Sequence, residues 1–336
     1  MKRILVGITL CLCVLAWVAL LIVQQPPEIG GDFYPIYFGA LKLLAGQDPY
    51  TAEASREMAS QWLTPYAAGF PYPLPMALIC APLVLIPLPV SMWLWTIFGT
   101  CGSFAALGLR PEWRKQLLLP LFFAPLYISI LVKQGTLVWF ALIVVLLFAM
   151  RRRSSWLIGL SVALLPIKPQ VGLFFAFAAL IWSWQNDRRA LYWAALWSIL
   201  IWGASFALLP SWPLGWLEEL KLYQAVNPAP SLLPWSLLLV LVTWKMSWPA
   251  RLAALQIAVF PLNSLYTLLP LLLVWLEIGG PLALLGASVS MLWLAFPFER
   301  SAAVLWALTG VPLIFCAAWR WRQSLRQVGG KQLAEG

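Results

Sequence analysis

Apolar runs separated by short polar breaks fill most of the chain. The first run covers residues 4–23, and one long polar stretch covers residues 24–73. Further apolar runs lie near residues 74–88, 90–109, 117–132, 135–150, 155–167, 171–184, 190–209, 232–244, 250–261, 265–277, 281–296 and 301–319. Because a membrane-crossing helix needs about 20 mostly apolar residues, the pattern predicts about 12 transmembrane helices. We therefore expect an all-α integral membrane protein in which residues 1–336 form a single polytopic domain.

The polar stretch 24–73 is expected to form the first external loop. Within it, Tyr34–Ala45 and Ala52–Leu63 mix apolar and polar residues at helical spacing, which predicts short helices lying in the membrane interface. Residues 74–89 follow and are rich in proline. Proline breaks helices, and a broken helix is tolerated in a membrane where neighbouring helices or a cavity satisfy its backbone. We expect this segment to be a re-entrant or half-crossing element.

Composition supports a membrane protein and removes other classes. Apolar residues make up 62% of the chain and charged residues 10%, with a mean hydropathy of +0.84. Soluble domains carry about 25% charged residues, so a soluble globule, a disordered chain and an added soluble catalytic domain are excluded. The 22 Lys and Arg residues report membrane topology rather than a nucleic-acid partner. Histidine, the commonest metal ligand, is absent, and neither a metal nor a cofactor is expected.

The basic residues predict how the chain is oriented in the membrane. When Arg151-Arg152-Arg153 is placed in the cytoplasm, the basic clusters near residues 110–115, 188–189, 245–251 and 320–331 fall there as well. We therefore expect an integral multi-pass protein of the plasma (inner) membrane with both termini cytoplasmic. The outward-facing polar segments are then residues 24–73, 133–134, 167–170, 210–231 and 260–266.

Two charged residues on that outer face are candidates for chemistry. Asp32 follows Gly30 and Gly31 just after the first helix, where a carboxylate can act as a general base at the membrane surface. The alternative is a solvated loop acid or a helix cap. Lys168 lies between Pro166 and Pro169 and is suited to a lipid phosphate in a cavity. Its alternative is a lysine that snorkels to the interface from a helix end.

Other polar breaks are less distinctive. Lys133-Gln134-Gly135 and Asn263-Ser264, with Tyr266 close behind, are each compatible with a plain connecting loop. No P-loop, Rossmann fingerprint, HExxH or GxSxG pattern is present, and neither is a DxD metal pair.

Several short motifs follow one another along the expected outer face. They are Gly31-Asp32-Phe33-Tyr34, Gly46-Gln47-Asp48-Pro49-Tyr50, Tyr72-Pro73-Leu74-Pro75, Lys133-Gln134-Gly135-Thr136, Leu165-Pro166-Ile167-Lys168-Pro169 and Phe260-Pro261-Leu262-Asn263-Ser264-Leu265-Tyr266. In order and placement they resemble glycosyltransferase family 87, the polyprenol-phosphate-mannose-dependent mannosyltransferases of the GT-C superfamily. The fourth motif resembles a Gly-Gln-x-Asn signature in which the Gly and the Asn are replaced here.

The resemblance implies a GT-C-type helical bundle and an inverting transfer of a hexose, mannose by analogy, from a polyprenyl-phosphate-sugar donor. The acceptor would be a lipid or glycan hydroxyl on the outer face. Asp32 would be the catalytic base, with Lys168, Gln134, Asn263, Tyr266 and Tyr34 binding substrate. Many relatives carry His or Asp in the late loop, where this chain has Asn263 and Tyr266. The alternatives are a transporter or flippase for lipid-linked sugars and a catalytically inactive GT-C scaffold.

Overall fold

A computed structural model describes residues 31–61, 69–226, 228, 231–260, 264–295 and 302–321. All regular structure in these ranges is helical, and none of them contains a strand. The predicted all-α class is therefore confirmed for this part of the chain. The expected first helix, residues 4–23, lies outside the described residues. The chain divides into two compact units, one of residues 1–111 and 128–229 and one of residues 112–127 and 230–336. The single domain expected from the sequence stays a prediction.

The first unit begins with two short helices in the predicted external loop. The turn η1 (Gly31–Phe33) leads into α2 (Tyr34–Leu44), and α3 (Ala52–Gln61) follows. Both helices match the ranges predicted from helical spacing. They pack through a hydrophobic cluster of Tyr34, Phe38, Ala54 and Met58, and Lys42 forms an ion pair with Glu57.

Prolines break the apolar segment that follows. Helix α4 (Leu74–Cys80) ends in the 3-10 turn η2 (Ala81–Leu85), and Pro87 precedes the long helix α5 (Leu88–Gly108). Together α4 and η2 form a short apolar element, whereas α5 is long and apolar enough to cross a membrane. The predicted break after residue 74 is therefore present, and only the second of the two segments has the length of a span.

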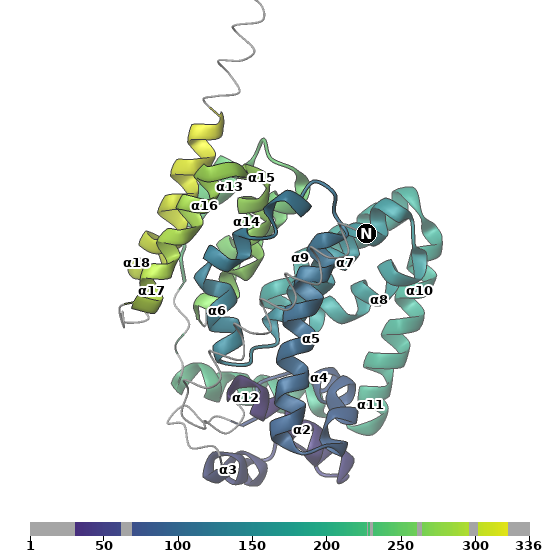
Figure 1. Cartoon of the computed structure of the whole chain (residues 1–336). Helices are drawn as coiled ribbons and strands as arrows, with labels where there is room; N and C mark the ends of the chain where they lie inside the picture. The colour runs from purple at the N-terminus through teal and green to yellow at the C-terminus, as the bar shows by residue number, and fades with distance from the viewer. Residues whose placement is uncertain are drawn as a thin grey trace, which may run out of the picture. The chain divides into compact units, whose positions relative to one another are not determined.

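The rest of the first unit is a set of packed helices. Figure 1 shows α5 beside α7 and α8 beside α10. Glycine permits the second contact, because a Cβ at Gly159 would lie 2.6 Å from the backbone nitrogen of Ala194. The remaining elements are α6 (Ala124–Leu131), which begins in the second unit, α7 (Thr136–Arg152), α8 (Ser155–Leu164), η5 (Leu165–Ile167), α9 (Pro169–Asn186), α10 (Arg188–Ser198), the π-helical turn η6 (Ile199–Gly203), α11 (Ala204–Leu208) and α12 (Trp212–Val226).

The second unit consists of shorter helices. Helix α14 packs against α13 and α15, and α15 packs against α16. Trp275 on α15 is almost fully buried and contacts Gly286 on α16, where a Cβ would lie 2.7 Å from the ring. The elements are η3 (Arg114–Gln116), η4 (Leu119–Phe122), α13 (Leu237–Thr243), α14 (Trp248–Val259), η7 (Leu265–Leu271), α15 (Leu272–Ile278), α16 (Gly280–Ser288), η8 (Val289–Met291), α17 (Leu292–Ala295), α18 (Ala302–Leu305) and the π-helical turn η9 (Trp306–Gly310). Residues 311–321 are also helical.

The predicted number of about 12 full crossings is not met in the described residues. Two helices, Leu88–Gly108 and Arg189–Leu208, are long and apolar enough to cross a membrane. A third crossing is present if Arg114–Phe122 and Ala124–Leu131, bent by 67°, form one span. Proline explains much of the difference, because most of the predicted runs contain or border one and each interrupts the helical hydrogen-bond ladder. The described residues therefore form an all-helical fold with two or three candidate spans, which is consistent with a helical membrane protein.

Candidate functional site

Asp32 is fixed in place by a close approach of two backbones. Gly31 has φ +49°, and a Cβ there would lie 2.9 Å from the carbonyl oxygen of Val132. The backbone N–H of Asp32 donates a hydrogen bond to that same oxygen at 2.8 Å. Phe33 is fully buried and stacks on Trp95 of α5, with 5.5 Å between ring centroids. Glycine before the aspartate and an aromatic anchor after it therefore set the position of the carboxylate.

Gln134 lies at the turn that ends α6. The N–H of Gln134 donates to the carbonyl of Ser129 at 2.8 Å, and the N–H of Lys133 donates to the carbonyl of Ile130 at 3.1 Å. This pair of bonds is a Schellman cap, which requires a left-handed residue and usually has glycine there. Lys133 occupies that position with φ +53°. Residues with strained backbone are enriched at functional sites, so this turn is a candidate part of one.

Lys168 lies in the proline-bounded break between η5 and α9. It precedes Pro169, the first residue of α9, and its carbonyl accepts hydrogen bonds from the N–H groups of Val171 and Gly172. Gly172 permits the tight turn, because a Cβ there would lie 2.7 Å from the carbonyl oxygen of Leu165. The Lys168 side chain is 2% exposed and points into the unit rather than to solvent. The snorkelling alternative is therefore wrong for this residue.

One amide joins these two charged side chains. The Gln134 Nε2 donates to Asp32 Oδ2 at 2.7 Å, and Lys168 Nζ donates to Gln134 Oε1 at 2.5 Å. The N–H of Gly135 also donates to Gln134 Oε1, at 2.8 Å. Gln134 is 2% exposed and Asp32 is half-buried, so the carboxylate is the accessible end. We call this arrangement the Asp32–Gln134–Lys168 chain.

Burial and opposite charges shift the pKa values of the groups in and around the Asp32–Gln134–Lys168 chain. Burial lowers the pKa of Lys168 to about 7, and the carboxylate of Asp32 opposes that shift. Tyr72, in the turn before α4, lies beside the same groups. Burial raises the pKa of its phenol well above 10 and the charge of Asp32 raises it further, while the contact with Gln134 lowers it. The site therefore holds a carboxylate, a titratable amine and a neutral phenol.

An apolar groove lies beside the α8–α9 break. Its volume is about 270 Å³, and Pro166, Phe177 and Trp202 contribute to its wall. Pro166 precedes Lys168 by two positions, so the groove and the buried ammonium share one segment of chain.

Glu219 is a second buried carboxylate, which the sequence analysis assigned to an external loop. It lies on α12 and is 2% exposed, and its Oε1 accepts a hydrogen bond from Ser55 Oγ at 2.6 Å. Its Oε2 lies against Gly69, where a Cβ would lie 2.3 Å from it. Burial raises the pKa of Glu219, opposed by the Ser55 hydroxyl and the backbone N–H of Gly69. The carboxyl group therefore joins α12 to α3.

A sequence signal for this helix was available. Pro213 lies at the helix start, where proline is favoured, and good helix formers dominate the residues from Trp216 to Val226. The loop predicted for residues 210–231 therefore contains a helix of 15 residues.

The remaining predicted site residues are Tyr34, Tyr266 and Asn263. Tyr34 is 4% exposed and packs on Phe38 in the α2–α3 cluster, with 6.1 Å between ring centroids. Tyr266 is 7% exposed and belongs to the second unit. Asn263 lies outside the described residues. A role for these three residues in substrate binding stays a prediction.

Comparisons with known proteins add no assignment. No protein-family model matches the chain, and neither a curated protein nor a solved structure matches it. Within the described residues, no group of His, Cys, Asp or Glu side chains has the arrangement of a metal site.

Proposed function

We propose that this protein is a membrane glycosyltransferase that moves a hexose from a polyprenyl-phosphate-sugar donor to a lipid or glycan hydroxyl. The observation that carries the proposal is the Asp32–Gln134–Lys168 chain, in which residues far apart in sequence place a carboxylate and an ammonium on one buried amide. A base and a cation side by side suit a reaction that removes a proton from one substrate and leaves charge on a phosphate.

Each residue has a separate part in the proposed transfer. The acceptor hydroxyl attacks the anomeric carbon of the sugar, and Asp32 takes the hydroxyl proton. The bond between that carbon and the phosphate oxygen breaks with inversion, and the polyprenyl phosphate leaves with an additional negative charge. Lys168, whose ammonium is 2% exposed, stabilises this charge from inside the protein through Gln134. The half-buried Asp32 is the end of the Asp32–Gln134–Lys168 chain that substrates reach first, because Gln134 and Lys168 are each 2% exposed.

One further feature supports a lipid-linked anionic donor. The apolar groove lined by Pro166 and Phe177 provides a surface for the first isoprene units. We further propose that the fold is of the GT-C type, with the first external loop on the outer face and both termini cytoplasmic.

The experiment that tests the proposal is donor binding and transfer by purified protein in detergent. Radiolabelled polyprenyl-phosphate-mannose is the donor, and crude membrane lipids are the acceptors. Lys168→Met keeps the side-chain length and removes the charge, so we expect donor affinity to fall about tenfold or more. Lys221→Met removes an exposed lysine of α12 and is the matched control, expected to bind as wild type.

Three results would contradict the proposal. The first is unchanged donor affinity in a folded Lys168→Met protein. The second is wild-type protein that binds donor and forms no glycosylated product with any acceptor fraction. The third is movement of intact donor across a liposome membrane without transfer, which would establish the transporter alternative.

A further inference from the structure

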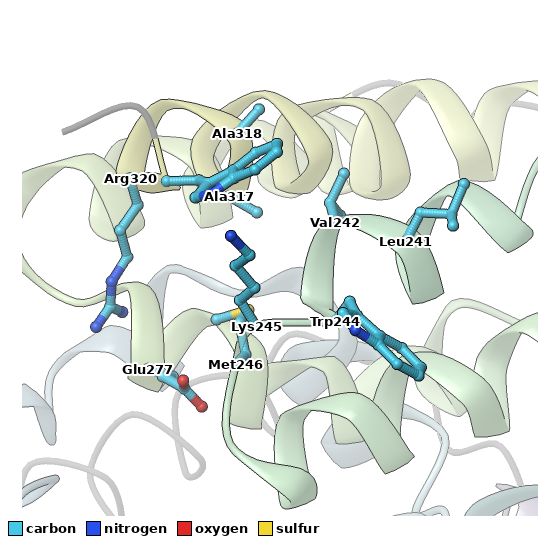
Figure 2. A pocket seen from close by; sticks show the side chains of 10 residues that line it. Leu241, Val242, Trp244, Lys245, Met246, Glu277, Ala317, Ala318 and Arg320 are labelled. Atoms are coloured by element: carbon cyan, nitrogen blue, oxygen red, sulfur yellow. The ribbon is translucent and has the colours of Figure 1, made fainter. Parts of the chain in front are cut away.

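The second unit contains an apolar groove with a basic rim. Its volume is about 790 Å³, within the roughly 300–1,000 Å³ typical of ligand sites. Figure 2 shows the groove between the end of α13, the loop after it and the helix of residues 311–321. Its lining residues are Leu241, Val242, Trp244, Lys245, Met246, Glu277, Ala317, Ala318, Arg320 and Trp321.

The apolar wall has the character of a surface covered by lipid. Leu241 and Trp244 are each 67% exposed, and Trp321 is 51% exposed, although all are large apolar side chains. In a helical membrane protein such side chains face acyl chains, and tryptophan is enriched at the level of the headgroups. The groove therefore has an acyl-facing wall and an interfacial edge.

The charges on the rim favour an anion. In Figure 2 the ammonium of Lys245 points toward the helix that carries Ala317 and Arg320, and it lies 4.9 Å from the centre of the Trp321 ring. Glu277 is already engaged, since its carboxylate accepts hydrogen bonds from the backbone N–H of Ser247, at 2.8 and 3.1 Å, and from the Ser247 hydroxyl. Among the described residues, neither Lys245 nor Arg320 forms an ion pair.

We propose that this groove binds an anionic phospholipid. Its phosphate lies between Lys245 and Arg320, and an acyl chain lies along Leu241, Val242 and Ala318. Basic pockets between membrane helices on the cytoplasmic side bind such headgroups, and the basic residues of this sequence predict that side for Lys245 and Arg320. The site is independent of the Asp32–Gln134–Lys168 chain and of the proposed transferase activity.

Lipid binding by the full chain tests the proposal. Detergent-purified protein is titrated with phosphatidylglycerol or with phosphatidylcholine of the same acyl chains, and bound lipid is counted by native mass spectrometry. We expect preferential retention of phosphatidylglycerol. Removing both charges in Lys245→Gln/Arg320→Gln should weaken the affinity for phosphatidylglycerol about 25-fold, because each basic residue near an anionic headgroup raises the affinity about fivefold.

Two further variants separate this site from general charge effects. Arg188→Gln is the matched control, because Arg188 is an exposed cation 5.2 Å from the centre of the Trp184 ring in the other unit. It should leave phosphatidylglycerol binding unchanged. Ala318→Trp fills the groove without removing a charge and should also weaken retention.

Equal retention of the two lipids by wild-type protein would overturn the proposal and would indicate that residues 322–336 or a protein partner occupies the groove. So would equal losses in Arg188→Gln and Lys245→Gln/Arg320→Gln. Unchanged retention in both groove variants would likewise place the lipid elsewhere.

Discussion

The turn that positions Asp32 should tolerate glycine alone at residue 31. Gly31→Ala adds a Cβ 2.9 Å from the carbonyl oxygen of Val132 and 3.0 Å from Cδ of Lys133. A left-handed backbone costs an L-residue about 1–2 kcal/mol. Shifting the Val132 carbonyl also weakens its hydrogen bond from the Asp32 N–H, which contributes about 0.5–1.5 kcal/mol. We therefore expect the free energy of unfolding to fall by about 2–3 kcal/mol.

Gly46→Ala is the matched control for this substitution. Gly46 has φ +68°, yet a Cβ there would meet no atom within 4 Å. Gly46→Ala should therefore lower the free energy of unfolding only by the cost of a left-handed backbone for alanine, about 1–2 kcal/mol. Unfolding in detergent, followed by the fluorescence of the tryptophans, measures both variants. Equal losses, or a harmless Gly31→Ala, would refute the close approach of residues 31 and 132.

Three further predictions follow from the described geometry. Because the pKa of Glu219 is raised in the folded protein, its protonated carboxyl contributes fully to stability below the unfolded-chain pKa of about 4.5. This contribution is lost as the pH rises through the folded-state pKa, so the free energy of unfolding should fall between pH 5 and 8. Glu219→Gln should abolish that fall in unfolding scans. Lys168, with a pKa of about 7, should take up close to one proton when an anionic donor binds at pH 8; calorimetry in buffers of different ionisation enthalpy measures this, and an equal uptake by Lys168→Met would contradict it. Lys133→Gly removes the strain of a left-handed backbone at φ +53° and should raise the free energy of unfolding by about 1 kcal/mol. A lower free energy of unfolding in this variant would mean that side-chain contacts of Lys133 outweigh the strain.

The local features of the site were predictable from sequence, and their assembly was predictable only in part. The prolines around Lys168 correctly indicated a helix break, whereas the glycines before Asp32 were expected to make room for a ligand and Gly31 instead lies against the Val132 backbone. The resemblance to family 87 brought Gln134 into the same set of residues. The hydrogen bonds among the three residues depend on how η1, α6 and α9 pack, and no local pattern encodes that packing.

The larger differences have physical causes as well. Apolar runs were counted as crossings, but proline shortens several of them into pieces below the length of a span. The alternation of expected crossings placed Glu219 in an external loop, and no local pattern predicted its burial on α12 beside Ser55. At residue 133, lysine hides a left-handed cap from the sequence, because glycine is the usual residue at that position.

The measurement that tests the central claim most directly is the turnover of Asp32→Asn with polyprenyl-phosphate-mannose and membrane acceptors. The amide preserves the shape of the side chain but cannot accept the acceptor proton, so transfer should fall about 100-fold or more while donor affinity stays near wild type. Asp48→Asn is the control, because Asp48 Oδ1 accepts a hydrogen bond from the N–H of Tyr50 in a turn and the amide retains that acceptor. Near-normal turnover by Asp32→Asn, with loss of activity in Asp48→Asn or Glu219→Gln, would contradict the account and place the base at another carboxylate.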